Sequence, residues 1–407
     1  MATAPSYRPL FSLPVVVAAL GYFVDVYDLL LFNIVRVTSL RDLGLSEQDI
    51  STVGGFIYNW QQAGLLIGGI AWGILADKQG RLSVLFGSII TYSLANIACG
   101  FVQDPNWYAA LRFVAGLGLA GELGAGITLI SEILPKYLRG YGSSLVASVG
   151  LLGAVVAYFT VVLFNWRTSY FVGGGLGALL LLLRVSVVES GMFDVAKTKA
   201  VARGSLGAFF SNQTRFFRYL RCMGIGLPTY FVIGLLATFG NEFGKALGIN
   251  EEIVSGRCVL FVFVGMVLGD IFSGLLSQWL RSRRLAIGIM ISMTFAGCLC
   301  YLYGGITTPA TFYALCGYLG FSIGYVAMFL AVTAETFGTN LRATATSTVS
   351  NFVRATTLLT IPLFQTLKLS LGVVAAGSVV GLLCFTIGYG SLWFIEETFH
   401  KDLDFVE

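Results

Sequence analysis

The sequence has 407 residues, of which 56% are hydrophobic and only 11% are charged. Soluble domains carry roughly 25% charged residues, so this composition excludes an ordinary soluble protein and indicates one that crosses a membrane repeatedly. The net charge of +4 is modest and predicts no nucleic-acid partner. The only histidine is His400 and the seven cysteines contain no CxxC pair, so we expect neither a metal site nor a cofactor.

Hydropathy predicts twelve membrane spans, because apolar stretches of about 20 residues recur along the whole chain. The first six are expected at 14–37, 52–76, 82–102, 108–134, 142–164 and 169–187. The other six are expected at 221–243, 256–280, 285–305, 310–336, 343–367 and 371–395. The prediction is an all-α membrane protein with two six-helix bundles, 1–187 and 221–407, and a cytosolic central loop at 188–220.

The distribution of basic residues predicts the orientation. The connections on the side of the two termini carry more arginine and lysine than those on the opposite side, and cytoplasmic loops are enriched in these residues. We therefore expect a multi-pass protein of the plasma (inner) membrane, with both termini in the cytosol.

The two halves of the chain repeat each other. SEILPKYLRG at 131–140 and AETFGTNLRA at 334–343 share one pattern, with Glu335 lying 203 residues after Glu132. GILADKQGR at 73–81 and GLLSQWLRSRR at 274–284 agree at an offset of 201. Parallel six-plus-six repeats are typical of secondary transporters, whose ligand site lies near the membrane midplane between the halves.

The segment Gly73–Arg81 resembles the loop 2–3 signature of the major facilitator superfamily, G-x-L-x-D-[RK]-x-G-[RK], and lies between the same two spans. Arg112-x3-Gly116-x-Gly118-x2-Gly121 resembles the family's span 4 motif. The resemblance covers the whole chain and implies the fold and a rocking mechanism of alternating access. It does not name the substrate.

Two carboxylates, Asp25 and Asp28, lie inside the first span on the same helix face as Tyr22. Asp25 is about 11 residues, or roughly 16 Å, into the span. Acids at this depth face water or partners, so we expect a role in proton coupling, with pairing to buried arginines as the alternative. The stretch DVYD at 25–28 also resembles the D-x-[FY]-D motif of aromatic-acid and phosphate symporters.

Span 4 carries a further buried acid, Glu122, among small residues. Ala120-Gly121-Glu122 resembles a segment of metabolite and sialic-acid symporters. We expect Glu122 to bind a proton or substrate; the alternative is a hydrogen bond to a neighbouring helix. Arg112, in the outer part of the same span, is expected to pair with an acid such as Asp28.

Span 11 contains a polar stripe in which Thr344, Ser347, Asn351, Arg354 and Thr357 recur at helical spacing. Arginine keeps its charge and offers donors suited to a carboxylate or phosphate. The region from Ala334 resembles organic-anion transporters, in which the corresponding arginine is associated with anionic substrates. We expect Arg354 and Asn351 to bind substrate; the alternative for Arg354 is a permanent ion pair with an acid of the first half.

Other polar residues are weaker candidates for the substrate site: Tyr58 and Gln61 on span 2, Tyr230 on span 7 and Tyr325 on span 10. A hydrogen bond between helices is at least as good an explanation for each of them.

Charged residues at the cytosolic ends of the spans are expected to form the inner gate. An aspartate at the end of span 2 can face the N-terminus of span 11, whose dipole favours negative charge. The residues assigned to this gate are Asp77, Gly80, Arg81, Glu132, Arg139, Glu335 and Arg342. They resemble the charge network of the major facilitator superfamily.

The sequence therefore predicts a proton-coupled transporter, expected to be monomeric, that takes up a small organic anion. An exporter that exchanges protons for a drug or cationic metabolite is the main alternative. A receptor that binds without transporting, and an intramembrane enzyme, are further alternatives; for the enzyme, we find no nucleophile elbow or metal motif.

Overall fold

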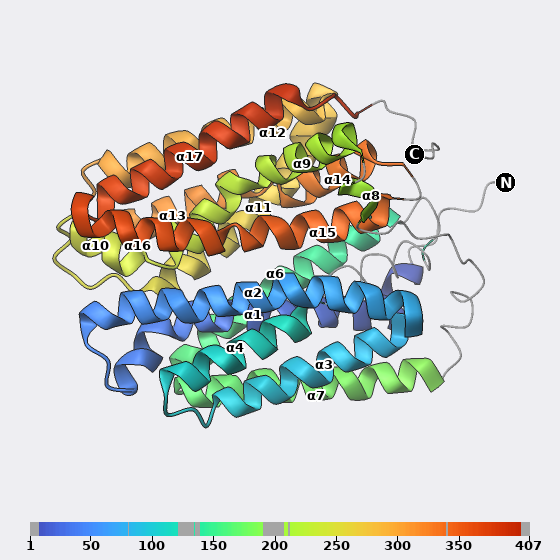
Figure 1. Ribbon diagram of the computed structural model, residues 1–407, viewed down its shortest axis with the longest axis horizontal. Coiled ribbons are helices and arrows are strands. Elements are labelled where there is room, and N and C mark those ends of the chain that lie inside the picture. The colour runs from blue at the N-terminus through green and yellow to red at the C-terminus, as the bar shows by residue number, and fades with distance from the viewer. Residues whose placement is uncertain are drawn as a thin grey trace.

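The computed structural model describes residues 8–79, 81–120, 134, 139–189, 207–210, 212–338 and 341–399. Every secondary-structure element in these ranges is a helix. The helices run along the long axis of the molecule in two groups, which occupy the lower and upper parts of Figure 1.

The lower group comes from the first half of the chain and is drawn in blue to green (Figure 1). It contains η1 (Arg8–Phe11), α1 (Leu13–Asp42), α2 (Glu47–Gln79), α3 (Arg81–Cys99), α4 (Pro105–Leu119), α6 (Arg139–Leu163) and α7 (Trp166–Glu189). Within it, α1 packs on α6, α2 on α4 and α3 on α7.

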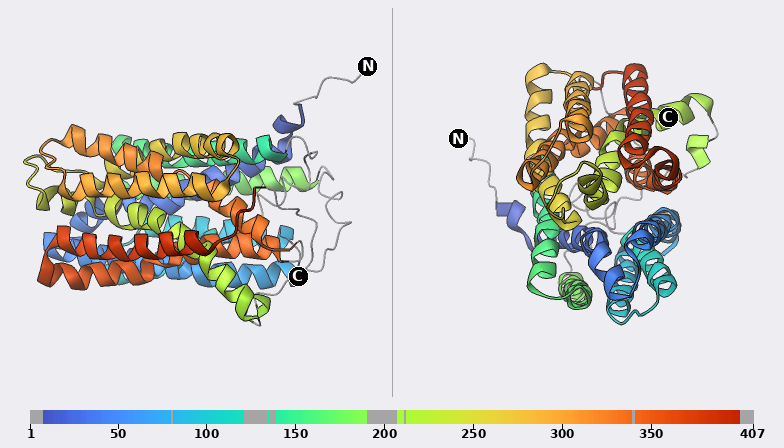
Figure 2. Two further views of the ribbon diagram at one scale, coloured as in Figure 1. Left: turned by 90° about the horizontal axis from the view of Figure 1, so that it is seen from above. Right: turned by 90° about the vertical axis from the view of Figure 1, so that its left-hand side faces the viewer.

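The upper group comes from the second half and runs from yellow-green to red. It contains α8 (Gly207–Phe210), α9 (Gln213–Phe231), the π-helix η4 (Val232–Ala237), α10 (Gly240–Ala246), α11 (Ser255–Leu280), α12 (Arg283–Tyr303), α13 (Pro309–Ile323), α14 (Val326–Thr336), α15 (Arg342–Ala355), α16 (Thr357–Leu371) and α17 (Val373–Phe394). Here α11 packs on α13, α12 on α17 and α9 on α15. The two groups meet where α11 contacts α1 and α6, and where α2 contacts α15 and α16. Figure 2 shows them from two further directions.

Helix starts follow local sequence signals. Asp104 accepts hydrogen bonds from the backbone N–H groups of Asn106 and Trp107, and Pro105 occupies the first position of α4. This is the combination of side-chain cap and N-terminal proline that satisfies the free donors of a helix start. α13 begins the same way, with Thr308 as the cap and Pro309 after it.

Three of the predicted spans are interrupted in the structure. Span 10 is divided into α13 and α14 at Gly324 and Tyr325, span 11 into α15 and α16 at Thr356, and span 7 passes through the π-helix η4. Span 7 also starts earlier than expected, at Gln213, because Asn212 caps its first turn. The π-helix follows α9 and the break in span 11 follows α15, and both α9 and α15 contribute to the site described below.

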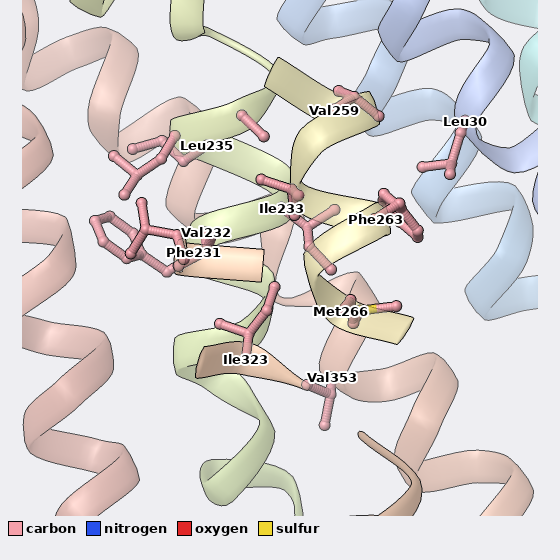
Figure 3. Close-up of a cluster of buried hydrophobic side chains, with 14 of the residues drawn as sticks. Leu30, Phe231, Val232, Ile233, Leu235, Val259, Phe263, Met266, Ile323 and Val353 are labelled. Atoms are coloured by element: carbon pink, nitrogen blue, oxygen red, sulfur yellow. The ribbon is translucent and has the colours of Figure 1, made fainter. Parts of the chain in front are cut away.

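A large apolar core fills the second helix group and reaches α1 of the first. Figure 3 shows Leu30 of α1 on the side of α11 that carries Phe263, with residues of η4 on the opposite side of α11. Many large apolar side chains are exposed on the outer surface, and seven described helices are long and apolar enough to cross a membrane. The fold is thus an all-helical, multi-pass membrane architecture.

Candidate functional site

Arg354 lies at the end of α15, directly before the break in span 11, and its side chain is buried. Its Nε donates a hydrogen bond to the hydroxyl of Tyr230 at 2.8 Å, which joins α15 to α9. Thr357 donates from Oγ1 to the Arg354 carbonyl at 2.8 Å, so the first residue of α16 holds the backbone at this point.

The surroundings of Arg354 are aromatic rather than acidic. Tyr22 of α1 and Tyr58 of α2 are near enough to interact electrostatically with its guanidinium, as is Tyr230. Among the described residues, no carboxylate is paired with Arg354. The alternative of a permanent ion pair with Asp25 or Asp28 is therefore not what the structure contains.

Asn351 lies one turn before Arg354 and is directed at α2. A Cβ added to Gly69 would lie 2.9 Å from its Nδ2 atom, so the small residue makes room for the Asn351 side chain. The substrate candidates Arg354, Asn351, Tyr22, Tyr58 and Tyr230 consequently come together from α1, α2, α9 and α15.

Asp28 forms a buried ion pair with Arg112, which confirms the predicted partner. The distance from Arg112 Nη1 to Asp28 Oδ1 is 3.1 Å, and Nη2 donates to the Asp28 carbonyl at 3.0 Å. Asn96 of α3 accepts from Arg112 Nη1 at 2.9 Å. Both charged side chains are completely buried, so the pair links α1, α3 and α4 in a water-poor environment.

Asp25 is also buried, one turn before Asp28 on α1, and interacts electrostatically with Tyr22. The Tyr22 ring lies against α6, because a side chain at Gly150 would collide with it. The third acid expected to couple protons, Glu122, lies outside the described residues.

On α2 the two candidates differ in what they contact. Gln61 donates from Nε2 to the Leu29 carbonyl of α1 at 3.2 Å, which is a bond between helices. Tyr58 is buried beside Asn33 and Gln62. The buried amide of Asn33 lies beside the Tyr58 hydroxyl and makes no hydrogen bond to any other described group.

Tyr325 lies at the break in span 10, between α13 and α14. Its hydroxyl donates to the Ile225 carbonyl of α9 at 3.0 Å, so it anchors the break in span 10 to span 7. Close by, Asp270 of α11 accepts from the backbone N–H of Ala327 at 3.3 Å and occupies the start of α14. The structure favours the alternative that Tyr325 makes a hydrogen bond between helices.

Of the residues expected at the inner gate, Glu335 is the one whose side chain is described. It pairs with Arg283 of α12 at 3.3 Å and accepts from Thr398 Oγ1 at 2.6 Å, and neither partner was anticipated. Gly80 and Glu132, and the side chains of Asp77, Arg81, Arg139 and Arg342, lie outside the described part of the chain.

A cluster at the opposite end of the molecule was missed by the sequence reasoning. Buried Arg36 of α1 donates from Nη2 to the Thr238 carbonyl at 2.9 Å and lies 3.9 Å from Glu242 of α10. Lys368 of α16 pairs with the same Glu242 at 2.9 Å and contacts Ser51 of α2. We call Arg36, Ser51, Glu242 and Lys368 the outer cluster. Nothing in the sequence shows that one acid joins Arg36 and Lys368.

Comparison with known proteins identifies the family. Residues 18–360 match the family model described as Major Facilitator Superfamily. A putative metabolite transport protein of Haemophilus influenzae is 28% identical over 83% of this chain and 84% of its own. The benzoate transport protein of Acinetobacter baylyi is 24% identical over 81% of this chain and 78% of its own. The niacin transporter NiaP of Acinetobacter baylyi is 34% identical over a shorter stretch, 39% of this chain and 36% of its own.

A solved structure agrees on the fold. The crystal structure of a D-xylose-proton symporter superposes with a TM-score of 0.69 over 97% of this chain and 99% of its own, at 15% sequence identity. Together with the family match over most of the chain, these similarities allow one conclusion. The chain belongs to the Major Facilitator Superfamily and is a membrane transporter, not an enzyme.

Proposed function

We propose that this transporter takes up a small organic anion together with protons, and that Arg354 binds the anion. The observation that carries the proposal is a buried guanidinium that is held by Tyr230 and has no carboxylate partner among the described residues. Buried charges are normally paired, so a free carboxylate arriving as substrate would supply the missing partner. Relatives named as transporters of benzoate and niacin are consistent with this substrate class.

The proposed substrate pocket combines this charge with aromatic surface. Tyr22, Tyr58 and Tyr230 surround the guanidinium, and Asn351 adds an amide one turn away. Such a setting suits a flat or compact acid whose carboxylate meets Arg354 while its body lies against rings. Gln61 and Tyr325 retain structural hydrogen bonds in this proposal, and their part in binding is secondary.

For the architecture we propose twelve spans in two six-helix halves, 1–187 and 221–407, joined by a cytosolic segment at 188–220, which rock about the site. A repeated contact supports this layout. Gly64 and Gly68 of α2 lie against the carbonyls of Phe113 and Leu117, and Gly265 and Gly269 of α11 lie against those of Gly317 and Phe321. The second set of glycines follows the first by 201 residues and the second set of carbonyls by 204, close to the offsets of the sequence repeat.

For coupling we propose that Asp25, Asp28 and Glu122 include the proton-binding groups. Protonation of Asp28 would remove the negative charge beside Arg112 and weaken the link among α1, α3 and α4. A proton bound at Asp28 would thereby alter the packing of α1, the helix that also carries Tyr22. Carboxylates at membrane depth are functional by default, which supports this assignment.

We propose that the outer cluster closes one side of the site, and that Asp77, Gly80, Arg81, Glu132, Arg139, Glu335 and Arg342 close the other. The outer cluster joins α1 and α2 to α10 and α16, so the halves cannot part there without breaking the Arg36–Glu242 ion pair and the hydrogen bond from Lys368 to Ser51. The proposed setting is the plasma membrane with both termini in the cytosol.

The test is binding and uptake by purified protein. Benzoate, nicotinate and a sialic acid would be screened for thermal stabilisation at pH 5.5 and 7.5, and the best ligand would then be tested for uptake into proteoliposomes with an inward proton gradient. We expect one acid to stabilise the protein, Arg354→Gln to abolish this effect, and Tyr230→Phe to weaken binding about five- to tenfold through loss of one charge-assisted hydrogen bond.

Arg257→Gln is the matched control, since Arg257 is an exposed arginine whose guanidinium bonds Tyr158 and not Tyr230. Stabilisation by cations instead of acids, or unchanged binding in Arg354→Gln, would contradict the proposal. Ligand efflux that is driven by an inward proton gradient would favour the alternative of an exporter.

A further inference from the structure

A groove of about 930 Å³ lies on the outside of the upper helix group, between α12, α13 and α17. Its walls are mainly apolar and include Leu285, Gly288, Ile289, Met293, Tyr318 and Leu392. One end is different, because Ser282, Arg284, Trp393 and Glu397 gather there. None of these residues belongs to the proposed transport site.

The acid at the polar end is fully occupied. Glu397 accepts hydrogen bonds from Ser282 Oγ and from the backbone N–H groups of Arg283, Arg284 and Phe399. Burial alone would raise the pKa of Glu397, but these hydrogen bonds outweigh it and the pKa is lowered. Glu397 is thus an ionised cap on the first turn of α12 and is not available to a cation.

The two neighbouring arginines, Arg283 and Arg284, differ in whether an acid is paired with them. Arg283 is paired with Glu335 and also donates to Ser277. Arg284 instead lies over the Trp393 ring at 5.8 Å, and no described carboxylate is paired with it. Among the described residues, Arg284 therefore has no ion-pair partner of its own at the mouth of the groove, where Glu397 is already bonded to Ser282 and to backbone N–H groups.

The groove has the dimensions and position of a lipid site. It continues along α12 from Arg284 to Ala296, which is about 18 Å at 1.5 Å per residue and similar to one leaflet of hydrocarbon. Trp393 is 73% exposed, and tryptophan is enriched at membrane–water boundaries. The charge thus lies at headgroup level and the apolar walls lie at acyl-chain level.

We propose that this groove binds an anionic glycerophospholipid, with its phosphate at Arg284 and an acyl chain along α12 and α17. The start of α12 lies at this polar end, where Ser282 and Glu397 already bind its first N–H groups, and the helix dipole there favours negative charge. Gly288 keeps the floor open, because a Cβ there would lie 3.3 Å from the Leu392 side chain.

The experiment measures lipid binding directly. Detergent-purified protein would be titrated with dioleoyl phosphatidylglycerol or dioleoyl phosphatidylcholine and the bound lipids counted by native mass spectrometry. We expect the anionic lipid to bind more tightly than the neutral one. Arg284→Gln should weaken phosphatidylglycerol binding about fivefold and leave phosphatidylcholine unchanged. Gly288→Leu should reduce binding of both lipids by filling the groove.

Arg281→Gln is the matched control, since it removes the same charge from the same loop but Arg281 does not line the groove. Equal binding of the two lipids by the natural protein, or equal losses in Arg284→Gln and Arg281→Gln, would overturn the proposal. A dimer that dissociates in Gly288→Leu would also overturn it, because a second copy would then be the occupant. Thermal unfolding in neutral lipid checks that the variants fold.

Discussion

Two buried arginines in this transporter have opposite surroundings. Arg112 has an acid, an amide and a carbonyl within hydrogen-bond distance, so its charge is fully compensated inside the protein. Arg354 has a tyrosine hydroxyl and nearby rings, but no carboxylate among the described residues. A buried charge without an internal counterion is costly unless a ligand supplies one. This contrast separates a structural or coupling arginine from the one proposed to bind substrate.

The Asp28–Arg112 pair leads to a prediction about stability. Asp28→Leu or Arg112→Met alone leaves one buried charge without its partner, and each should lower the free energy of unfolding by about 3–5 kcal/mol. The double variant removes both charges and should recover most of that loss. Unfolding in mixed micelles measures all three, with transport assayed in parallel.

The double variant also tests the coupling role. If Asp28 carries protons, the stable double variant should bind substrate but lose uptake driven by a proton gradient. Gradient-driven uptake at the normal rate would assign the pair a purely structural role. A double variant no more stable than the single ones would mean that the two charges do not compensate each other.

For single residues, the sequence indicated which side chains are candidates for the site, but it indicated their contact partners less well. Arg112, in the outer part of span 4, was expected to pair with an acid such as Asp28. The bond between Arg354 and Tyr230 could not be foreseen, since it depends on how α9 meets α15 at an interruption of each span. Likewise, the sequence gives no reason to single out Asn33, one amide in an apolar run, yet it is buried beside Tyr58.

At the level of helices, apolar length predicted where spans occur but not where they break. Gly324 is one of 50 glycines, and only the structure shows that it lies against the backbone of Gly269. The break beside it leaves backbone donors at the start of α14, and Asp270 accepts from one of them. Hydropathy is insensitive to such contacts, which is why 310–336 and 343–367 were predicted as continuous helices.

The close packing of α2 on α4 gives a prediction for these helices. A Cβ at Gly64 would collide with the Phe113 carbonyl, which is backbone and cannot rotate away. Gly64→Ala should therefore lower the free energy of unfolding by about 1–3 kcal/mol, the usual cost of overpacking, despite the better helix propensity of alanine.

The matched control is Gly175→Ala on α7, where nothing lies within 4 Å of the added atom. It should be neutral or slightly stabilising, because it gains helix propensity without a collision. Equal effects of the two substitutions in a thermal-unfolding assay would show that backbone approach does not limit α2. Gly265→Ala should behave like Gly64→Ala if the contact in the second half is equivalent.

For the whole molecule, one group of polar contacts between the two helix groups lies on the predicted outer side. Arg36 reaches Thr238 and Glu242, and Lys368 reaches both Glu242 and Ser51, so four helices are joined by a few polar groups. Single residues could be assigned to this side from the sequence. Their convergence depends on how the halves are docked, which no local pattern encodes.

The outer cluster gives a prediction about conformational equilibrium. Glu242 is the acid shared by Arg36 and Lys368, and Glu242→Gln removes both ion pairs while keeping the size of the side chain. The halves should then separate more readily on this side. Spin labels at Thr52 of α2 and Leu369 of α16, both exposed, should report a longer and broader distance distribution in the variant. Because opening and closing must alternate for transport, turnover should fall while substrate binding is retained.

Glu251→Gln, at an exposed acid nearby, should leave the distance distribution and the turnover unchanged. An unchanged distance distribution in Glu242→Gln would mean that apolar packing between α1 and α11, rather than this cluster, holds the outer side closed.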